Sequence, residues 1–163
     1  MSTLLIVWHS RTGGAKQMAE AAATAAGADG DTRVWMVEAE YATAEDLLEA
    51  DGYLFVCPEN LASMSGEMKA FFDRCYYPVL DRVAGRPYAA MVCAGSDGHG
   101  TIRQIERIAT GWRLKPVADP LLVITGAQTP EAISAPKTLH ELDLSRCAEL
   151  GAAFGAGLAM GIY

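Results

Sequence analysis

Three segments rich in glycine and hydroxyl side chains could bind a small molecule, and each directly follows a run of apolar residues. The first, residues 9–16 (HSRTGGAK), offers two hydroxyls and successive backbone N–H groups ahead of an alanine-rich stretch. Backbone N–H groups at a helix N-terminus attract anions because the positive end of the helix dipole lies there. The segment predicts a phosphate-binding loop, with a plain strand-to-helix turn as the alternative.

The spacing within this loop disfavours several kinds of phosphate chemistry. It lacks both the G-x-x-x-x-G-K-[ST] pattern of a nucleoside-triphosphate loop and the G-x-G-x-x-G pattern of a dinucleotide loop. No acidic pair follows the first apolar run to hold Mg²⁺, and no cysteine is followed six residues later by arginine. A P-loop NTPase, a receiver domain and a cysteine phosphatase are therefore disfavoured.

The third segment, residues 94–100 (AGSDGHG), contains the one titratable ring expected within reach of a ligand, His99. Gly95 and Gly98 permit a close approach of the backbone to that ligand. His99 could donate a hydrogen bond to it, although a solvent-facing loop histidine is the simpler interpretation. Asp97 is expected to cap the helix that follows rather than to act as a general base.

His9 and the four cysteines are interpreted as structural residues. His9 is expected to be a partly buried residue, and no metal site is predicted. The four cysteines are far apart in the sequence and mostly lie in apolar runs, where a free cysteine behaves as a small buried hydrophobe. With no export signal at the N-terminus, they are expected to be reduced core residues of a cytoplasmic protein.

The segments are positioned by alternating strand and helix patterns. Apolar runs predict strands at 4–8, 32–37, 52–57, 88–94 and 117–124, and helical periodicity predicts helices near 13–26, 43–48, 65–75, 101–112 and 138–158. This alternation predicts an α/β fold with a mainly parallel sheet covered on both faces. Ligands bind at the carboxyl ends of the strands in such folds, where these segments lie.

Individual prolines, helix caps and glycines add detail to the predicted strands and helices. Pro116 and Pro120 interrupt the last strand and suit an edge position. Thr43 is expected to be a helix N-cap followed by acidic residues, Thr138 to open a capping box, Ser65 to cap a helix, and residues 125–137 to form a polar connection. Gly151, Gly155, Gly157 and Gly161 in the last helix are expected to pack closely against a neighbouring backbone, the sheet or a second subunit.

The length, charge and composition of the chain limit the kinds of partner that it can bind. The chain of 163 residues is expected to form one domain over residues 1–163, and its formal charge of −7 repels nucleic acid. Its longest weakly polar run, residues 150–163, is shorter than the roughly 20 residues of a membrane span. Arg103, Arg107, Arg113 and Lys115 form a local basic excess, which is expected to be solvated, with the 2′-phosphate of NADPH as the alternative.

The first loop resembles the FMN-phosphate loop of the flavodoxin-like family. Residues Ser10-Arg11-Thr12-Gly13-Gly14 match the family's [ST]-x-[ST]-G-x-[ST] pattern, with Ala15 in place of the last hydroxyl. The resemblance implies a three-layer α/β sandwich with a five-stranded parallel sheet of order 2-1-3-4-5, and FMN as cofactor. Because Ala15 has no hydroxyl, the loop has one hydrogen-bond donor fewer for the phosphate.

The second segment, which begins at residue 58, is the most specific match. Residues 58–74 resemble the P-x-x-x-x-x-x-S-G-x-M-K-x-F-x-D-R segment of NAD(P)H-dependent FMN reductases and tryptophan-repressor-binding-protein-like quinone oxidoreductases. The resemblance implies that this loop borders the pyrimidine edge of the isoalloxazine and that residues 94–100 pass its other side. Met68, Phe71 and Phe72 are expected to be core residues, and Asp73 and Arg74 a surface or interface pair.

The resemblance thus implies one set of FMN-binding residues, while no side chain is assigned with certainty as catalytic, because the flavin carries the chemistry. The set is Ser10, Arg11, Thr12, Gly13, Gly14, Pro58, Glu59, Asn60, Leu61, Ala62, Ser63, Met64, Ala94, Gly95, Ser96, Gly98 and His99.

Neither flavin-bordering loop contains an aromatic residue, whereas electron-carrier flavodoxins usually enclose the flavin between aromatic side chains. An open flavin face favours an NADPH- or NADH-dependent oxidoreductase that passes hydride through flavin N5 to a quinone-like acceptor. Trp8, Tyr41 and Trp112 are expected to lie in the core or at the rim. A flavodoxin-type electron carrier and a non-catalytic FMN-binding protein remain alternatives, and a homodimer or homotetramer is compatible with the chain's size.

Overall fold

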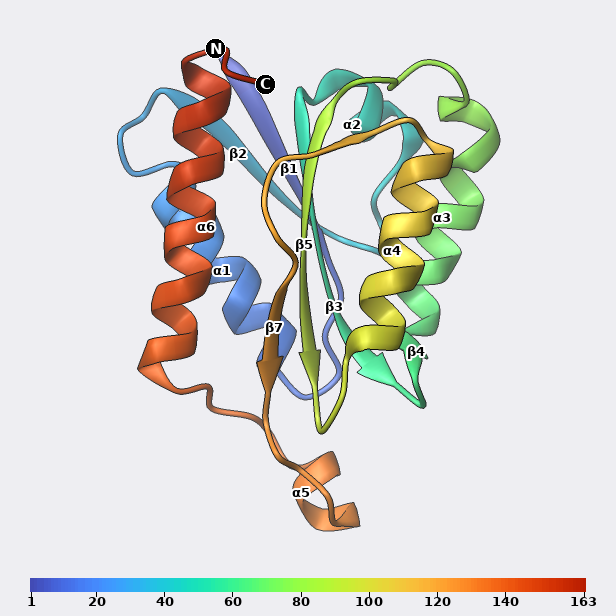
Figure 1. Ribbon diagram of the computed structural model, residues 1–163, viewed down its shortest axis with the longest axis vertical. Helices are drawn as coiled ribbons and strands as arrows, with labels where there is room; N and C mark the ends of the chain where they lie inside the picture. Colours follow the sequence, from blue (N-terminus) through green and yellow to red (C-terminus); the bar gives the residue numbers. More distant parts are fainter.

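The computed structural model describes residues 1–163 and contains a twisted sheet between two layers of helices (Figure 1). The strands are β1 (Ser2–Trp8), β2 (Thr32–Glu38), β3 (Gly52–Asn60), β4 (Ser63–Met64), β5 (Pro87–Ala94), β6 (Lys115–Pro116) and β7 (Leu121–Ile124). The helices are α1 (Gly14–Ala26), α2 (Ala44–Glu49), α3 (Gly66–Val79), α4 (His99–Gly111), α5 (Pro130–Ser134) and α6 (Glu141–Ala159).

The parallel order predicted from the sequence is confirmed, but the sheet has seven strands instead of five. Its order is β2-β1-β3-β5, with β6 and β7 both paired in parallel to β5. The predicted last strand is thus divided into two short strands on the same edge, because Pro116 and Pro120 have no N–H to donate to a ladder. The additional strand β4 pairs antiparallel with the end of β3.

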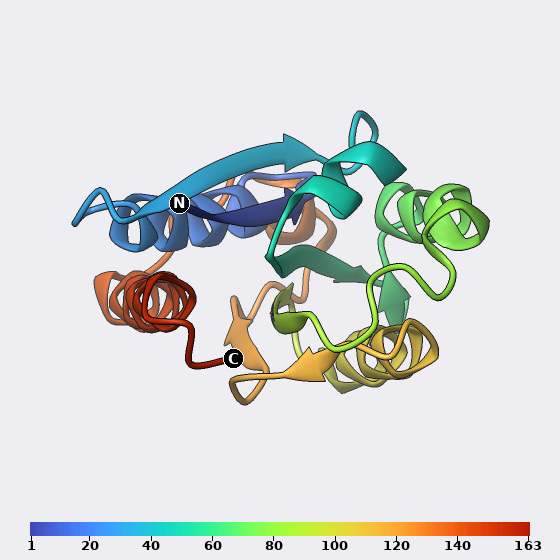
Figure 2. The same cartoon turned by 90° about the horizontal axis from the view of Figure 1, so that it is seen from above.

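Alternating side chains of the central strands fill two separate cores. Leu4 and Ile6 of β1 belong to the core under α1 and α6, while Leu5 and Val7 belong to the core under α2, α3 and α4. This is the period of two expected for a strand that is buried on both faces. Seen from above in Figure 2, the strands lie between the two groups of helices.

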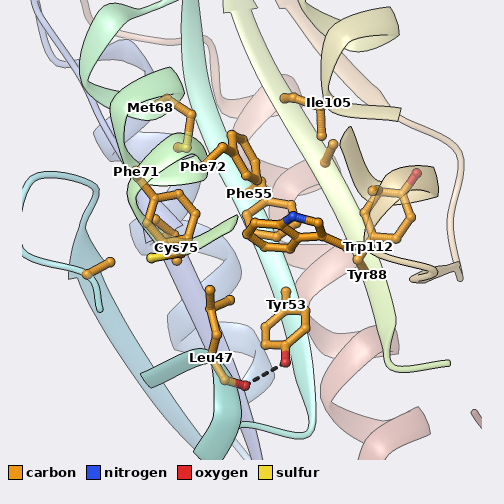
Figure 3. Close-up of a cluster of buried hydrophobic side chains, with 14 of the residues drawn as sticks. Leu47, Tyr53, Phe55, Met68, Phe71, Phe72, Cys75, Tyr88, Ile105 and Trp112 are labelled. Carbon is orange, nitrogen blue, oxygen red and sulfur yellow. Dashed lines mark hydrogen bonds between the residues drawn. The ribbon is translucent and has the colours of Figure 1, made fainter. Parts of the chain in front are cut away.

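Aromatic side chains dominate the core beneath α3 and α4 (Figure 3). The Phe55 ring lies 5.0 Å from that of Phe72, and Phe72 lies 5.4 Å from Trp112, with ring centroids as the reference points. Both pairs meet edge to face, the arrangement that the aromatic quadrupole favours. Phe71 and Phe72 are therefore core residues as predicted, and Trp112 is a core residue too.

The glycines of α6 allow the predicted close approach to another backbone, but that backbone is α1 rather than the sheet or a second subunit, and Gly161 lies beyond the end of the helix. A Cβ atom at Gly151 would lie 2.2 Å from the carbonyl oxygen of Ala22, and one at Gly155 would lie 2.5 Å from that of Ala26. Gly157 is covered by the ring of Tyr163. At Gly151 and Gly155 the two helices are thus in contact through their backbones.

Three predicted helix caps differ in the structure, and one is confirmed. Thr43 is the N-cap of α2, as predicted, and it also forms a capping box with Asp46. The final helix begins at Glu141, where His140 Nδ1 accepts from Leu142 N, so the capping box at Thr138 is wrong. Ser65 occupies the N-cap position of α3 but its hydroxyl contacts His9 instead, and α4 is capped at Gly98 rather than Asp97.

None of the helices combines the length and the apolar character that a membrane span requires. All four cysteines are free and buried. Burial raises the pKa of Cys57 to about 12 and that of Cys93 to about 11, so these thiols stay protonated at neutral pH. Protonated thiols are poor nucleophiles and poor metal ligands, in line with the structural role predicted for them.

Candidate functional site

The carboxyl ends of β1, β3, β5 and β7 surround a cavity of about 570 Å³, at the lower edge of the sheet in Figure 1. This volume is in the usual range for a small-molecule or cofactor site. Four segments line it, and the lining residues are Ser10, Arg11, Thr12, Gly14, Ala15, Pro58, Glu59, Asn60, Leu61, Ala62, Cys93, Ala94, Gly95, Ser96, Thr125, Ala127, Gln128, Ile133, Ser134 and Lys137.

The first loop presents backbone donors with no acceptor in the protein. Gly13 adopts a φ of +98°, and its N–H donates to Ser10 Oγ at 3.0 Å. The N–H groups of residues 10–12 and 14–16 make no hydrogen bond to any other part of the chain, and the first turn of α1 contains no acidic residue. The loop and the helix end therefore form a concentration of free donors on one wall of the cavity.

The N-terminus of α4, at the same edge of the sheet, is already occupied by side chains of the protein. Glu59 accepts from Gly98 N at 2.8 Å with one carboxylate oxygen and from Thr101 N at 3.2 Å with the other. Asp97 Oδ1 accepts from His99 N at 3.1 Å. Since carboxylates already satisfy this helix end, α1 is the helix that can take an anionic ligand.

Strands β3 and β4 form a hairpin whose tip reaches the cavity. Leu61 and Ala62 have φ values of 52° and 66°, so the two-residue turn has both central residues in the left-handed region, as a type I′ turn requires. Leu61 is fully exposed at 101%. The backbone of Gly100 fits closely against this tip, because a Cβ there would lie 2.5 Å from the Ala62 carbonyl oxygen.

The structure brings most predicted site residues together but places five of them outside the cavity lining. Gly13 turns its N–H toward Ser10, and Ser63 Oγ contacts Gln104 on α4. Met64 is 5% exposed and belongs to the aromatic core, so its side chain cannot face the cavity. Gly98 is buried against Leu122, and His99 is exposed to solvent outside the residues that line the cavity.

Beside the cavity, a chain of polar contacts joins the first loop to α3. His9 Nδ1 lies 2.8 Å from Ser65 Oγ, and His9 Nε2 lies 3.4 Å from Glu67 Oε2. Arg11 Nη2 donates to both oxygens of Glu67, at 3.0 and 2.7 Å. This confirms the structural role predicted for His9 and fixes the first loop against the second segment.

This polar chain resembles a catalytic triad in its residue types only. Ser65 is 1% exposed, so its hydroxyl cannot reach a substrate. Burial lowers the pKa of His9, which favours its neutral form. His9, Glu40 and Glu67 bring possible metal ligands within 4.8 Å of one another, but Arg11 already takes both oxygens of Glu67, so we assign no metal to this cluster.

The fourth wall of the cavity was not predicted from the sequence. Thr125, Ala127, Gln128, Ile133, Ser134 and Lys137 belong to the segment expected to be a plain polar connection. It contains α5, where Thr129 Oγ1 accepts from Ala132 N and Pro130 occupies the first turn. The Thr-Pro pair is the local signal that could have predicted this helix.

Two arginine predictions also need correction or refinement. Arg74 does not pair with Asp73; it donates to the carbonyl oxygens of Ala39 and Ala42 at 2.8 and 2.7 Å, while Asp73 pairs with Lys69. Arg11 was expected as a loop residue of the site and both lines the cavity and holds Glu67. Neither interaction has a signature in local sequence spacing.

No aromatic side chain lines the cavity. Trp112 lies in the opposite core, Tyr41 is 71% exposed, and Trp8 is half-buried with the Lys16 ammonium 5.9 Å from the centre of its ring. The cavity walls around the hairpin tip and α5 therefore consist of aliphatic and polar side chains, none of them aromatic. A planar ligand bound there would keep a face that no aromatic residue of this chain covers.

A parallel sheet of this order, with a cavity at the carboxyl ends of its strands and a free helix N-terminus in one wall, defines a flavodoxin-like α/β sandwich. The chain belongs to the NADPH-dependent FMN reductase family, whose model it matches over residues 37–128, more than half of its length. The match includes the second and third segments of the site. The first loop lies N-terminal to the matched residues and is not part of the match.

Comparison with individual proteins agrees with this fold. A flavodoxin of Aquifex aeolicus (strain VF5) is 34% identical over 100 residues, 61% of this chain and 54% of that protein, so the chain matches about half of its curated relative. A flavodoxin from the domain Archaea superposes with a TM-score of 0.77 at 18% identity, covering 96% of this chain and 98% of the other.

A flavodoxin, WrbA-like protein from Agrobacterium tumefaciens superposes with a TM-score of 0.68 at 20% identity, covering 98% of this chain and 99% of that one. Oxidised flavodoxin 1 from Bacillus cereus gives a TM-score of 0.78 at 18% identity, covering 96% and 99%. At these identities the structural likeness shows the fold alone.

Proposed function

We propose that this chain binds FMN in the cavity and acts as an NAD(P)H-dependent oxidoreductase with a quinone-like small acceptor. The observation that carries the proposal is the set of N–H groups at residues 10–12 and 14–16 that have no acceptor in the protein. Free donors at the positive end of α1 suit a phosphate ester, and the rest of the cavity has room for the attached flavin.

The fit to FMN extends beyond the phosphate. The N–H groups of Leu61, Ala62 and Gly95 also lack acceptors, and these residues line the same cavity. They provide donors for the polar edge of an isoalloxazine ring, where negative charge develops on reduction. The exposed side chain of Leu61 supplies apolar surface that a planar ring would cover.

When bound, FMN supplies hydride chemistry at its N5 atom. The chain's own residues then have the tasks of binding and orientation: the first loop holds the phosphate, and the hairpin tip and residues 94–96 border the ring. Because no aromatic side chain lines the cavity, one face is left for a nicotinamide or an acceptor. No side chain is required as acid or base, and His99 lies outside the lining.

The test is to load the purified protein with FMN, add NADPH or NADH without oxygen, and follow the absorption band of oxidised flavin. Bleaching of the bound flavin, followed by its return when a quinone is added, is the expected result. Flavin that binds but stays oxidised with both donors would contradict the reductase proposal.

A flavodoxin-type electron carrier is the second candidate, supported by the formal charge of −7. An acidic carrier docks by electrostatic steering to a basic partner, so its reduction by that partner falls steeply with salt. NADH and NADPH are anions, so salt does not weaken their encounter with an acidic protein in this way. The salt dependence of flavin reduction therefore separates the two candidates.

A further inference from the structure

We propose that Lys137 is the phosphate-recognition cation of the site and makes it select phosphorylated flavin over the phosphate-free form. The inference rests on the proposed function, since it concerns the same cavity. It goes further by assigning ligand selectivity to a residue that belongs to no phosphate-loop motif and lies more than a hundred residues after the loop in the sequence.

The position of the ammonium group is set by three acceptors. Lys137 Nζ donates to Thr12 Oγ1 at 3.2 Å, to the carbonyl oxygen of Ile133 at 2.9 Å and to that of Ala135 at 2.6 Å. An ammonium has three donors, so all of them are used in the ligand-free protein, and Lys137 acts on a bound phosphate through its charge at short range. Because Thr12 Oγ1 accepts from Lys137, the hydrogen of its own hydroxyl remains free to be donated to an anion in the cradle.

The charge of this ammonium is not neutralised within the protein. No carboxylate lies within ion-pairing distance of Lys137, and two of its three acceptors are backbone carbonyls near the end of α5. The other cation in the cavity wall, Arg11, is paired with Glu67. Lys137 is thus the uncompensated positive charge of the cavity, at the loop where Ala15 replaces a hydroxyl.

The backbone around Lys137 is held against the phosphate loop before any ligand binds. Lys137 N donates to the Thr12 carbonyl oxygen at 2.8 Å. Gln17 Nε2 donates to the carbonyl oxygens of Lys137 and Gly13 at 2.7 and 2.9 Å, and Gln17 Oε1 accepts from Leu139 N at 3.0 Å. A cation held in this way loses little additional freedom when it meets a phosphate.

The test compares the dissociation constants of FMN and riboflavin, measured by quenching of flavin fluorescence in the wild type and in Lys137→Met. Riboflavin has the same ring and ribityl chain but no phosphate. We expect the FMN constant to rise about 10- to 100-fold and the riboflavin constant to change less than about twofold, since a positive charge without a carboxylate partner attracts a nearby phosphate dianion and has no such effect on a neutral ligand. Lys137→Arg, which keeps the charge, should recover most of the selectivity.

Lys69→Met is the matched control, because it removes the same charge from an exposed position on α3 that does not line the cavity. It should leave both constants unchanged. A second readout is the ³¹P resonance of bound FMN, whose position and pH dependence should differ between the wild type and Lys137→Met. If Lys137→Met does not fold, Lys137→Gln, which retains a donor for the α5 carbonyls, takes its place.

The outcomes separate this inference from the proposed function. If wild-type protein binds FMN but Lys137→Met weakens FMN and riboflavin equally, Lys137 only supports the fold of the wall and the inference is wrong. An unchanged FMN constant overturns it as well. If the wild type binds neither flavin, the proposed function itself fails.

Discussion

Thr101, in the first turn of α4, is fully buried and its hydroxyl has no hydrogen-bond partner. Replacing it by valine keeps the shape and removes the desolvated hydroxyl, so Thr101→Val should raise the free energy of unfolding by about 1 kcal/mol. The free energy of unfolding of the variant and the wild type is measured by urea denaturation. Thr110→Val, which removes an exposed hydroxyl, is the control. A loss of stability in Thr101→Val would show that the hydroxyl has a partner in solution.

Leu61 combines a positive φ of 52° with full exposure at 101%. A left-handed conformation costs a non-glycine residue about 1–2 kcal/mol, and glycine avoids it at some loss of chain entropy. Leu61→Gly should therefore stabilise the protein without ligand by about 0.5–1 kcal/mol in thermal or urea unfolding.

The same Leu61→Gly substitution should weaken flavin binding, because it removes apolar surface from the cavity wall. Ala118→Gly, in an exposed bend without positive φ, should bring no gain in stability. Unchanged stability in Leu61→Gly would mean that the turn relaxes out of the left-handed region before the ligand arrives.

At the level of single residues, the sequence predicts what depends on local spacing. The pattern at residues 10–14 identifies the loop that presents free donors, since its glycines and hydroxyls are adjacent in the chain. Glu59 could be predicted as a site residue but not as the cap of α4, because its partners Gly98 and Thr101 lie about forty residues further on. Nothing local marks Lys137 as a neighbour of Thr12.

At the scale of helices, the contact of α1 with α6 depends on the missing side chain of Gly151. An added Cβ would lie 2.2 Å from the Ala22 carbonyl oxygen and 2.6 Å from the Ala22 Cα, both of which are backbone atoms that cannot rotate away. Gly151→Ala should therefore lower the free energy of unfolding by about 2–3 kcal/mol through forced separation of the helices.

Gly111→Ala is the control for this substitution, since nothing lies within 4 Å of a Cβ at that position at the end of α4. It should be neutral or stabilise by up to about 1 kcal/mol through helix propensity. The contact of α1 with α6 is tested by comparing the denaturation midpoints of Gly151→Ala and Gly111→Ala under the same conditions. Equal stability of both would show that α6 can move outward at no cost.

The elements themselves are largely predictable because their apolar periods are local properties. Residues 4–8, 52–57 and 88–94 are continuous apolar runs, and they form the central strands β1, β3 and β5. The pairing of Glu59 and Asn60 with Met64 and Ser63 that makes β4 depends on a left-handed turn at Leu61 and Ala62, where glycine or asparagine would be the usual signal. That turn was missed for this reason, whereas α5 was missed although Thr129 and Pro130 mark its start.

At the scale of the whole molecule, acid should destabilise the fold through His9 and Glu67. Burial lowers the pKa of His9 below its ordinary 6.5, and a backbone hydrogen bond lowers the pKa of Glu67 below its ordinary 4.5, with His9 and Arg11 adding to the effect. In both cases the unfolded chain binds more protons, so stability falls as the pH drops. The His9 contribution is lost below about pH 6.5 and that of Glu67 below about pH 4.5.

The expected result is a urea midpoint that decreases between about pH 7 and pH 5, with a shallower decrease in His9→Gln. His99→Gln, which removes an exposed loop histidine, should retain the wild-type slope. An identical slope in His9→Gln and the wild type would assign the pH dependence to other groups.

The free N–H groups of the first loop also determine how fast their hydrogens are replaced by solvent deuterium. Exchange is slow where a hydrogen bond must first open, and residues 10–12 and 14–16 have no such bond within the chain. In the ligand-free protein these amides should exchange nearly as fast as in a peptide, although they follow strand β1, whose residues 3–7 are buried. FMN or inorganic phosphate should slow them selectively, so deuterium uptake at these few positions reports on occupancy of the site without any measurement of turnover.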